Sequence, residues 1–281
     1  MIEYIIVAIL QGLFEWLPIS SSGQVMIVAI NFLGISPEKA FSLAIFLHLG
    51  TTLAVLVRFR SEFILIIKAF LPGTFQSEEK DIKLRNWLII ATIGTAITAL
   101  PLYFFFRYML VEGFSAAQGD IITLIISGLL IFTGILLLIG KKAFGDKKLE
   151  TIESPSVNKN SVIAGLTQGI SILPGVSRSG VTVTTILFEK FEQEQALKLS
   201  FLMSVPAAIA SIGVDVLFGE GSVFGVLDLT TIVVITGVSF LVGLLSMEAL
   251  LKVARRMEFG IFCILYGIIA FAVIIPFLVL N

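Results

Sequence analysis

The sequence predicts an all-α polytopic membrane protein with six transmembrane helices and two re-entrant helix–loop–helix hairpins in inverted repeats. The prediction depends on an apolar composition, six long uncharged stretches and two apolar regions interrupted by polar breaks. Of 281 residues, 57% are hydrophobic and 14% are charged, with a net charge of −1. A soluble domain carries about 25% charged residues. This composition excludes soluble enzymes and nucleic-acid-binding proteins, so we expect no nucleic-acid partner.

The six predicted spans are the long stretches that contain no Asp, Glu, Lys or Arg. A bilayer core of roughly 30 Å needs about 20 apolar residues per spanning helix. Lipid cannot satisfy the hydrogen bonds of open strand edges, so each span must be helical. The spans are residues 40–57, 86–106, 121–140, 199–214, 229–247 and 259–281.

Two further apolar regions are each divided by a polar break that contains glycine. Residues 3–34 are interrupted by Pro-Ile-Ser-Ser-Ser-Gly at 18–23, and residues 160–188 by Pro-Gly-Val-Ser-Arg-Ser-Gly at 174–180. Each half is too short to cross a bilayer. This pattern predicts re-entrant hairpins that reach mid-membrane, where irregular backbone is tolerated only beside protein or a water-filled cavity.

The two interrupted regions also predict an internal repeat within a single membrane domain, 1–281. Gln11-Gly12 precedes the first break as Gln168-Gly169 precedes the second. Repeat one covers about 1–140, a cytoplasmic linker covers 141–160, and repeat two covers about 160–281. Each copy has one hairpin and three spans, an odd number, so the copies must lie in opposite orientations, as in many transporters. Chance similarity between two Gly/Pro breaks is the alternative.

The distribution of Lys and Arg predicts the orientation in the plasma membrane. Most of these residues lie in the connections at 58–86, 141–160 and 248–258, whereas the N-terminal side carries Lys39 and Arg107. By the positive-inside rule, the basic side is cytoplasmic and both termini lie outside. The first hairpin then enters from outside and the second from the cytoplasm.

Two ionisable residues inside the predicted membrane region are the first candidates for function, because burying them in lipid is costly. They are Glu15, at the end of the first half-helix, and Arg178, in the second break. Opposed hairpins would bring both into one polar chamber. The other candidates to line it and bind substrate are Gln11, Ser20, Ser21, Ser22, Ser177, Ser179 and Thr182.

This set of side chains suits a phosphorylated ligand. The guanidinium of Arg178 is always charged, and its N–H groups match phosphate. Half-helices that begin just after Gly23 and Gly180 would direct positive dipole ends at the chamber. Glu15 could act as a base, or hold a divalent cation together with the phosphate. Structural alternatives are a buried Glu15–Arg178 salt bridge, serines that cap helices, and a His48 that only packs.

The two breaks carry motifs that resemble the undecaprenyl-pyrophosphate phosphatase family, the bacitracin-resistance type. That family shows (Glu/Gln)-x-x-x-Glu leading into Leu-Pro-x-Ser-Ser-x-Gly-His, and later Pro-Gly-x-Ser-Arg-Ser-Gly-x-Thr. Here the stretches read Gln11-Gly-Leu-Phe-Glu15-Trp-Leu-Pro-Ile-Ser20-Ser21-Ser22-Gly23-Gln24 and Pro174-Gly-Val-Ser177-Arg178-Ser179-Gly180-Val-Thr182. The resemblance covers nearly the whole chain and includes His48-Leu-Gly-Thr and the segment 200–206.

The resemblance implies removal of the terminal phosphate from a long-chain, C55-type polyprenyl pyrophosphate, which recycles a lipid carrier for envelope synthesis. It implies a site open to the outer face and a divalent cation, Mg²⁺ or Ca²⁺. Glu15, Ser21 and Arg178 match the family's catalytic positions. Glu15 would be metal ligand or base, Ser21 would be the nucleophile or orient it, and Arg178 would stabilise charge on the phosphoryl group.

One position departs from the family pattern, because Gln24 stands where the family has histidine. Glutamine cannot exchange protons as imidazole does, although it can bind a phosphate oxygen. Three outcomes follow: Ser21 and Glu15 suffice, His48 substitutes, or the chain binds lipid phosphates without hydrolysis. The alternative functions are therefore a polyprenyl-phosphate flippase and a non-catalytic membrane scaffold.

Overall fold

The computed structural model describes residues 1–17, 19–70, 78–109, 119–140, 145–219 and 223–253, together with Ile264 and Ile268. The described part of the chain is helical and contains no strand beyond an isolated bridge between Lys147 and Phe191. The predicted all-α class is therefore confirmed. The predicted span 259–281 lies outside the described residues, apart from the two isoleucines.

Long apolar helices form the frame of the molecule. Four of the described helices are long and apolar enough to cross a membrane: α3 (Pro37–Arg58), α5 (Glu79–Tyr108), α9 (Gln193–Phe218) and α11 (Leu229–Val253). They contain the predicted spans 40–57, 86–106, 199–214 and 229–247. A further helix, α6 (Gly119–Gly140), coincides with the predicted span 121–140. The chain is therefore a polytopic integral membrane protein.

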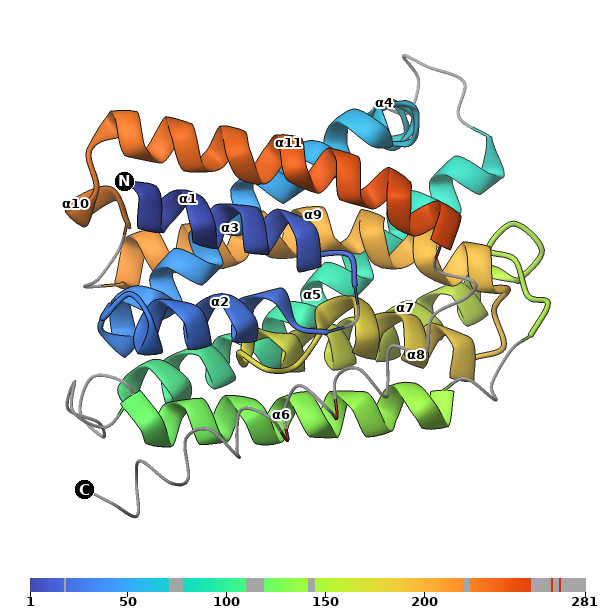
Figure 1. The fold of residues 1–281 in the computed structure, drawn as a ribbon. Helices are drawn as coiled ribbons and strands as arrows, with labels where there is room; N and C mark the ends of the chain where they lie inside the picture. Colours follow the sequence, from blue (N-terminus) through green and yellow to red (C-terminus); the bar gives the residue numbers. More distant parts are fainter. Residues whose placement is uncertain are drawn as a thin grey trace.

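Two helix–break–helix units occupy the two interrupted regions. In the first, α1 (Ile2–Phe14) is followed by α2 (Ser21–Asn31). In the second, α7 (Ser154–Gly169) and a short 3₁₀ turn precede α8 (Arg178–Phe188). Figure 1 shows α1 and α2 towards one end of the molecule and α7 and α8 towards the other, with α6, α9 and α11 running along its length. The breaks of the two units meet near the centre.

The starting points of α2 and α8 differ from the prediction. Both helices begin before the glycine, at Ser21 and Arg178, so Gly23 and Gly180 lie inside the first turn. The hydroxyls of Ser20 and Ser177 accept hydrogen bonds from the backbone N–H groups of those glycines. A serine at the N-cap satisfies a donor that the helix leaves free. These two N–H groups therefore donate to the capping hydroxyls.

Small residues let α1 and α7 pack closely against long helices. A Cβ added at Gly12 would lie 2.8 Å from Val242 Cβ on α11, and one at Gly169 would lie 2.7 Å from Thr98 Cβ on α5. Close approach of helix backbones through small residues is common in membrane proteins, where packing replaces the hydrophobic effect. Each Gln-Gly pair therefore marks a similar helix contact in its own unit.

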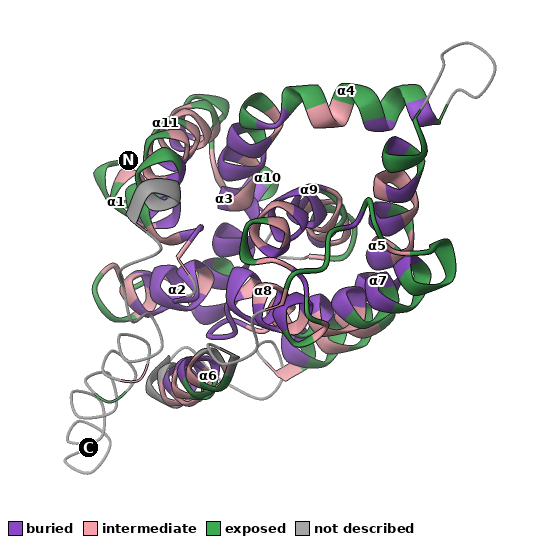
Figure 2. Cartoon of the chain, turned by 90° about the vertical axis from the view of Figure 1, so that its right-hand side faces the viewer, coloured by how far each residue is buried: buried purple, intermediate pink, exposed green. Residues whose placement is uncertain are grey.

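Buried residues face the interior of the bundle, and exposed apolar residues cover much of its outer surface (Figure 2). Ile97, Phe105 and Leu241 are exposed examples, as expected for helices that face lipid. An ionic cluster joins the ends of α3, α5 and α9. In this cluster Arg107 contacts Glu38 at 2.9 Å and Asp215 at 3.4 Å.

The remaining described helices are short and lie outside this frame. They are α4 (Arg60–Ala69), which follows α3, and α10 (Val223–Val226), which precedes α11.

Candidate active site

The carboxylate of Glu15 is the centre of the candidate site. Glu15 follows the last residue of α1 and is 5% exposed. Its Oε2 accepts hydrogen bonds from Gln11 Nε2 at 2.5 Å and from Ser21 Oγ at 2.8 Å. Gln11 lies one helical turn earlier on the same face, as the i, i+4 spacing requires. Ser21 is the first residue of α2, so the break between α1 and α2 places its hydroxyl, the candidate nucleophile, beside the carboxylate.

Arg178 reaches Glu15 from the other unit. Its Nη2 forms an ion pair with Glu15 Oε1, although the two residues lie 163 positions apart in sequence. Arg178 is the first residue of α8, directly after the cap Ser177. The predicted convergence of Glu15 and Arg178 is therefore present. In the described structure the buried carboxylate thus has both a cation and neutral donors as partners.

The hydroxyl of Ser20 connects the two breaks. Ser20 Oγ accepts from Gly23 N at 3.3 Å within its own break and from Gly175 N at 3.0 Å in the other. Gly175 has φ +101°, which favours glycine. A Cβ added at Gly23 would lie 2.7 Å from Gly175 N. Two glycines and one serine therefore allow the backbones of the breaks to touch.

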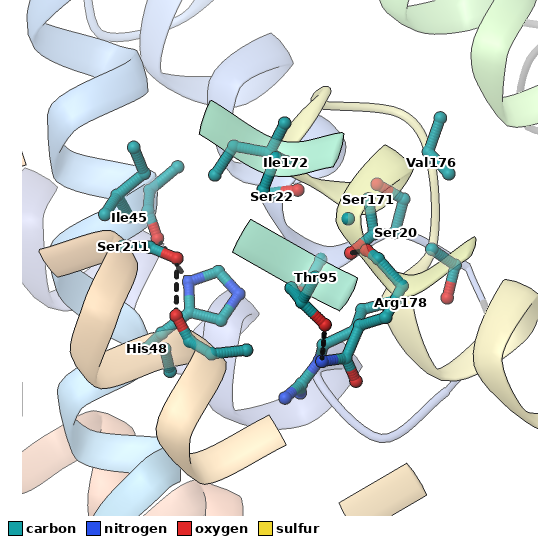
Figure 3. Close-up of a pocket in the computed structure, with 18 of the residues that line it drawn as sticks. Ser20, Ser22, Ile45, His48, Thr95, Ser171, Ile172, Val176, Arg178 and Ser211 are labelled. Atoms are coloured by element: carbon teal, nitrogen blue, oxygen red, sulfur yellow. Dashed lines mark hydrogen bonds between the residues drawn. The ribbon is translucent and has the colours of Figure 1, made fainter. Parts of the chain in front are cut away.

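Glu15, Ser21 and Arg178 line a common cavity of about 80 Å³. Figure 3 shows Ser20, Ser171 and Arg178 on one side, with His48 of α3 and Ser211 of α9 across from them. The predicted site residues that line the cavity are Glu15, Ser20, Ser21, Ser22, Ser177 and Arg178. The polar groups converge within an apolar shell that includes Phe41 and Ile45.

His48 lines the same cavity and contacts the central carboxylate. Its Nε2 lies 3.3 Å from Glu15 Oε2, and its Nδ1 lies 2.7 Å from the carbonyl oxygen of Ala44. The carbonyl of the preceding helical turn therefore holds one ring nitrogen while the other faces Glu15. His48 is more than a packing residue, because its ring borders the chamber.

Four predicted substrate-binding residues lie outside the cavity lining: Gln11, Gln24, Ser179 and Thr182. Gln24 Nε2 donates to the carbonyl of Ile19 at 2.9 Å, so this amide supports the backbone of the break. Ser179 Oγ donates to the carbonyl of Leu17 at 3.3 Å. Gln11 reaches the site through Glu15. A direct contact of these four with substrate stays a prediction.

The cavity lining also includes polar residues that the sequence analysis did not name as site candidates. Gln168, Ser171 and Thr95 are among them. Gln168 Nε2 donates to Thr95 Oγ1 at 3.1 Å, which joins α7 to α5. The repeat contained a signal for Gln168, because it stands where Gln11 stands in the first unit. Thr95 carries no such signal, since a threonine in an apolar helix is common.

The carboxylate oxygens of Glu15 are hard oxygen ligands of the kind that Mg²⁺ and Ca²⁺ prefer. Glu15 lines the cavity whereas Gln11 does not, so Glu15 is the side chain that could hold a cation there. Among the described residues, however, no three His, Cys, Asp or Glu side chains converge. Phosphate oxygens of a ligand would have to complete the coordination.

A buried carboxylate, a serine hydroxyl and an arginine within an integral membrane protein form a polar chamber whose chemistry suits a phosphorylated ligand. Residues 4–272 match the model of the family described as bacitracin resistance protein BacA. The chain belongs to this family.

Curated relatives cover nearly all of the chain. A protein of Methanothrix thermoacetophila, named undecaprenyl-diphosphatase, is 41% identical over 96% of this chain and 96% of its own length. A protein of the same name from Methanopyrus kandleri is 38% identical over 96% of this chain and 94% of its own length. A third, from Haloarcula marismortui, is 36% identical over 94% and 93% respectively. The resemblance found in the motifs is therefore confirmed.

Proposed function

We propose that the protein hydrolyses a long-chain polyprenyl pyrophosphate of the undecaprenyl type to the monophosphate and inorganic phosphate. This reaction would recycle a lipid carrier for envelope or glycan synthesis. The observation that carries the proposal is the convergence of Glu15, Ser21 and Arg178 in one buried chamber. Membership of the family and the names of the relatives support it.

The contacts suggest a role for each residue. Ser21 Oγ attacks the terminal phosphorus, and its proton passes to Glu15, to which it already donates. The bond to the bridging oxygen breaks, and the polyprenyl monophosphate leaves. Water then attacks the phosphoserine, the bond between phosphorus and Ser21 Oγ breaks, and inorganic phosphate leaves as a proton returns to the serine hydroxyl. Arg178 stabilises negative charge on the transferred group. A divalent cation held by Glu15 and the pyrophosphate would neutralise further charge.

His48 supplies the imidazole that position 24 lacks. The amide of Gln24 donates a hydrogen bond to the carbonyl of Ile19, whereas the His48 ring borders the cavity beside Glu15. A histidine in this place can transfer a proton to the leaving oxygen. This role removes the difficulty that Gln24 raises for hydrolysis.

The membrane arrangement belongs to the proposal. The chain would have six spans and two re-entrant hairpins in inverted repeats, with both termini outside and the site open to the outer face. The entry of the two units from opposite ends of the bundle supports it (Figure 1), as do their equivalent serine caps and Gln-Gly contacts. The same repeated packing favours a polyprenyl-phosphate flippase as the second candidate function.

Phosphate release distinguishes these functions. The purified protein in detergent is given a long-chain polyprenyl pyrophosphate, with and without Mg²⁺ or Ca²⁺, and free phosphate is measured. Glu15→Gln and Arg178→Ala should each lower kcat by about 10³-fold or more. Binding of polyprenyl phosphate that depends on Arg178, without any phosphate release, would instead support the flippase. A scaffold would show neither, and Arg178→Ala would impair its folding.

A further inference from the structure

An apolar groove lies between α5 and α9, beside the polar chamber. Its volume is about 150 Å³, and its wall includes Ala96, Leu100, Tyr103 and Ala210. Thr95, Ala99, Ile172, Ala207 and Ser211 line both the groove and the chamber. The two spaces are therefore neighbours that share one wall, and a ligand with two chemically different parts could occupy both.

The groove presents hydrocarbon even where its wall contains hydroxyl groups. Thr92 Oγ1 and Thr95 Oγ1 donate to carbonyls one helical turn earlier, at 2.6 and 2.8 Å. Ser211 Oγ donates in the same way to Ala207 O at 2.7 Å, and Tyr103 OH donates to Asp215 at 2.9 Å. These hydroxyl protons are used inside the protein. A polar ligand would find few free partners here.

The groove borders an exposed apolar part of the surface. Leu100 in its wall is 39% exposed, and Ala210 is also exposed. Ile97 and Ile209, the sequence neighbours of Ala96 and Ala210, are 63% and 54% exposed. Both helices are long and apolar enough to cross a membrane. The small side chains of Ala96 and Ala210 leave room between them that larger residues would fill.

We propose that this groove binds the first isoprene units of the polyprenyl chain while the pyrophosphate lies in the chamber. The inference rests on the proposed function, because it takes the same lipid as its ligand. A pyrophosphate at Arg178 needs an apolar place for its tail, and the groove adjoins the chamber along the five residues that line both. Burying hydrocarbon there adds binding energy along the chain.

Bulky substitutions in the groove test this placement. Ala96 and Ala210 line the groove and not the chamber. Ala96→Phe and Ala210→Phe should therefore raise KM for the long-chain pyrophosphate about tenfold, equivalent to the loss of one or two buried methylenes. Ala249→Phe, an exposed alanine on α11, is the matched control and should keep the wild-type KM. Folded Ala96 and Ala210 variants with wild-type KM would overturn the proposal.

A second measurement on the unmodified protein does not depend on turnover. A long-chain polyprenyl monophosphate with a diazirine on its first isoprene units is photolysed on the protein, and the labelled residues are mapped. Labels on α5 and α9 that excess polyprenyl phosphate removes, and a phospholipid does not, would support the groove. Labels elsewhere, or equal competition by phospholipid, would overturn it. Absence of phosphate release with correct labelling would count against hydrolysis alone.

Discussion

The two helix–break–helix units use the same backbone device for different chemistry. In each, a serine caps the second helix by accepting from the N–H of a glycine three residues later. The first unit then contributes an anion and a hydroxyl, Glu15 and Ser21, whereas the second contributes a cation, Arg178. Neither unit alone brings both charges to the chamber, whose lining contains Glu15 from the first unit and Arg178 from the second. The difference shows that a repeated scaffold can divide one site between its two copies.

Among the changes that compare the two units, the largest expected effect comes from replacing the guanidinium that the second unit contributes. Arg178→Lys keeps the positive charge but loses the planar fork of donors. We expect kcat for phosphate release to fall about 10²-fold, since a single lost transition-state donor has this effect. Steady-state kinetics with a thermal unfolding control would measure it. Wild-type kcat in the lysine variant would show that charge alone is required.

The next prediction concerns the histidine that complements the first unit. His48→Gln should lower kcat by about 10²-fold, because a positioned proton-transfer group contributes at least this much. The control is Thr51→Val on the same helix, whose hydroxyl donates to the carbonyl of His48 rather than to the cavity. Turnover unchanged by His48→Gln would assign proton transfer to Glu15 alone.

Gly23 and Gly180 occupy equivalent positions in the two units, but substitution by alanine should lower the free energy of unfolding by different amounts. A Cβ at Gly23 would lie 2.7 Å from the backbone nitrogen of Gly175, whereas one at Gly180 would lie 3.1 Å or more from the side chains of Ser177 and Thr133. We expect Gly23→Ala to lower the free energy of unfolding by about 2–3 kcal/mol, and Gly180→Ala by less than about 1 kcal/mol. Unfolding in detergent micelles compares the pair. Equal losses would mean that the breaks separate readily.

The two capping serines provide a smaller contrast. Ser20→Ala removes the acceptor for two backbone N–H groups, one in each break, and should cost about 2 kcal/mol of unfolding free energy. Ser177→Ala removes the acceptor for the N–H of Gly180 and should cost about 1 kcal/mol. The same unfolding measurement applies, with Ser61→Ala at an exposed position of α4 as reference. A larger loss in Ser177→Ala would contradict the bridging role of Ser20.

The smallest expected effect on stability concerns the residue that follows the second helix of each unit. Burial raises the pKa of Glu189, directly after α8, to about 8, although Lys147 and Lys159 oppose the shift. Both carboxylate oxygens are buried without a hydrogen-bond partner in the described structure. The corresponding residue after α2 is Phe32, which does not titrate.

Because the folded state favours protonated Glu189, its contribution is complete below about pH 4.5 and is lost as pH rises to about 8. Over this range the wild type should lose roughly 1 kcal/mol relative to Glu189→Gln, since partial exposure screens the charge. Melting temperatures at several pH values would measure the difference. Parallel curves for the two proteins would show that Glu189 titrates normally.

The sequence predicted the site residues better than their individual contacts. Intramembrane Glu15 and Arg178 were recognisable because charge is costly in lipid, and their meeting followed from two opposed breaks. The sequence left open whether Ser20 and Ser177 cap helices or bind ligand, and it did not predict Gln24 as a backbone support, since a hydroxyl or amide can bind ligand or backbone equally well. The start of α2 and α8 before the glycines was missed for the same reason.

The sequence by itself determined the helical membrane class, the positions of the two breaks and the chemical character of the site. Hydropathy and charge depend on residue type and spacing, so no tertiary structure was needed. Only the tertiary structure decided that Arg178 pairs with Glu15, that His48 enters the chamber and that an apolar groove adjoins it. These features depend on the distances between helices far apart in sequence, which the packing of Gly12, Gly23 and Gly169 sets.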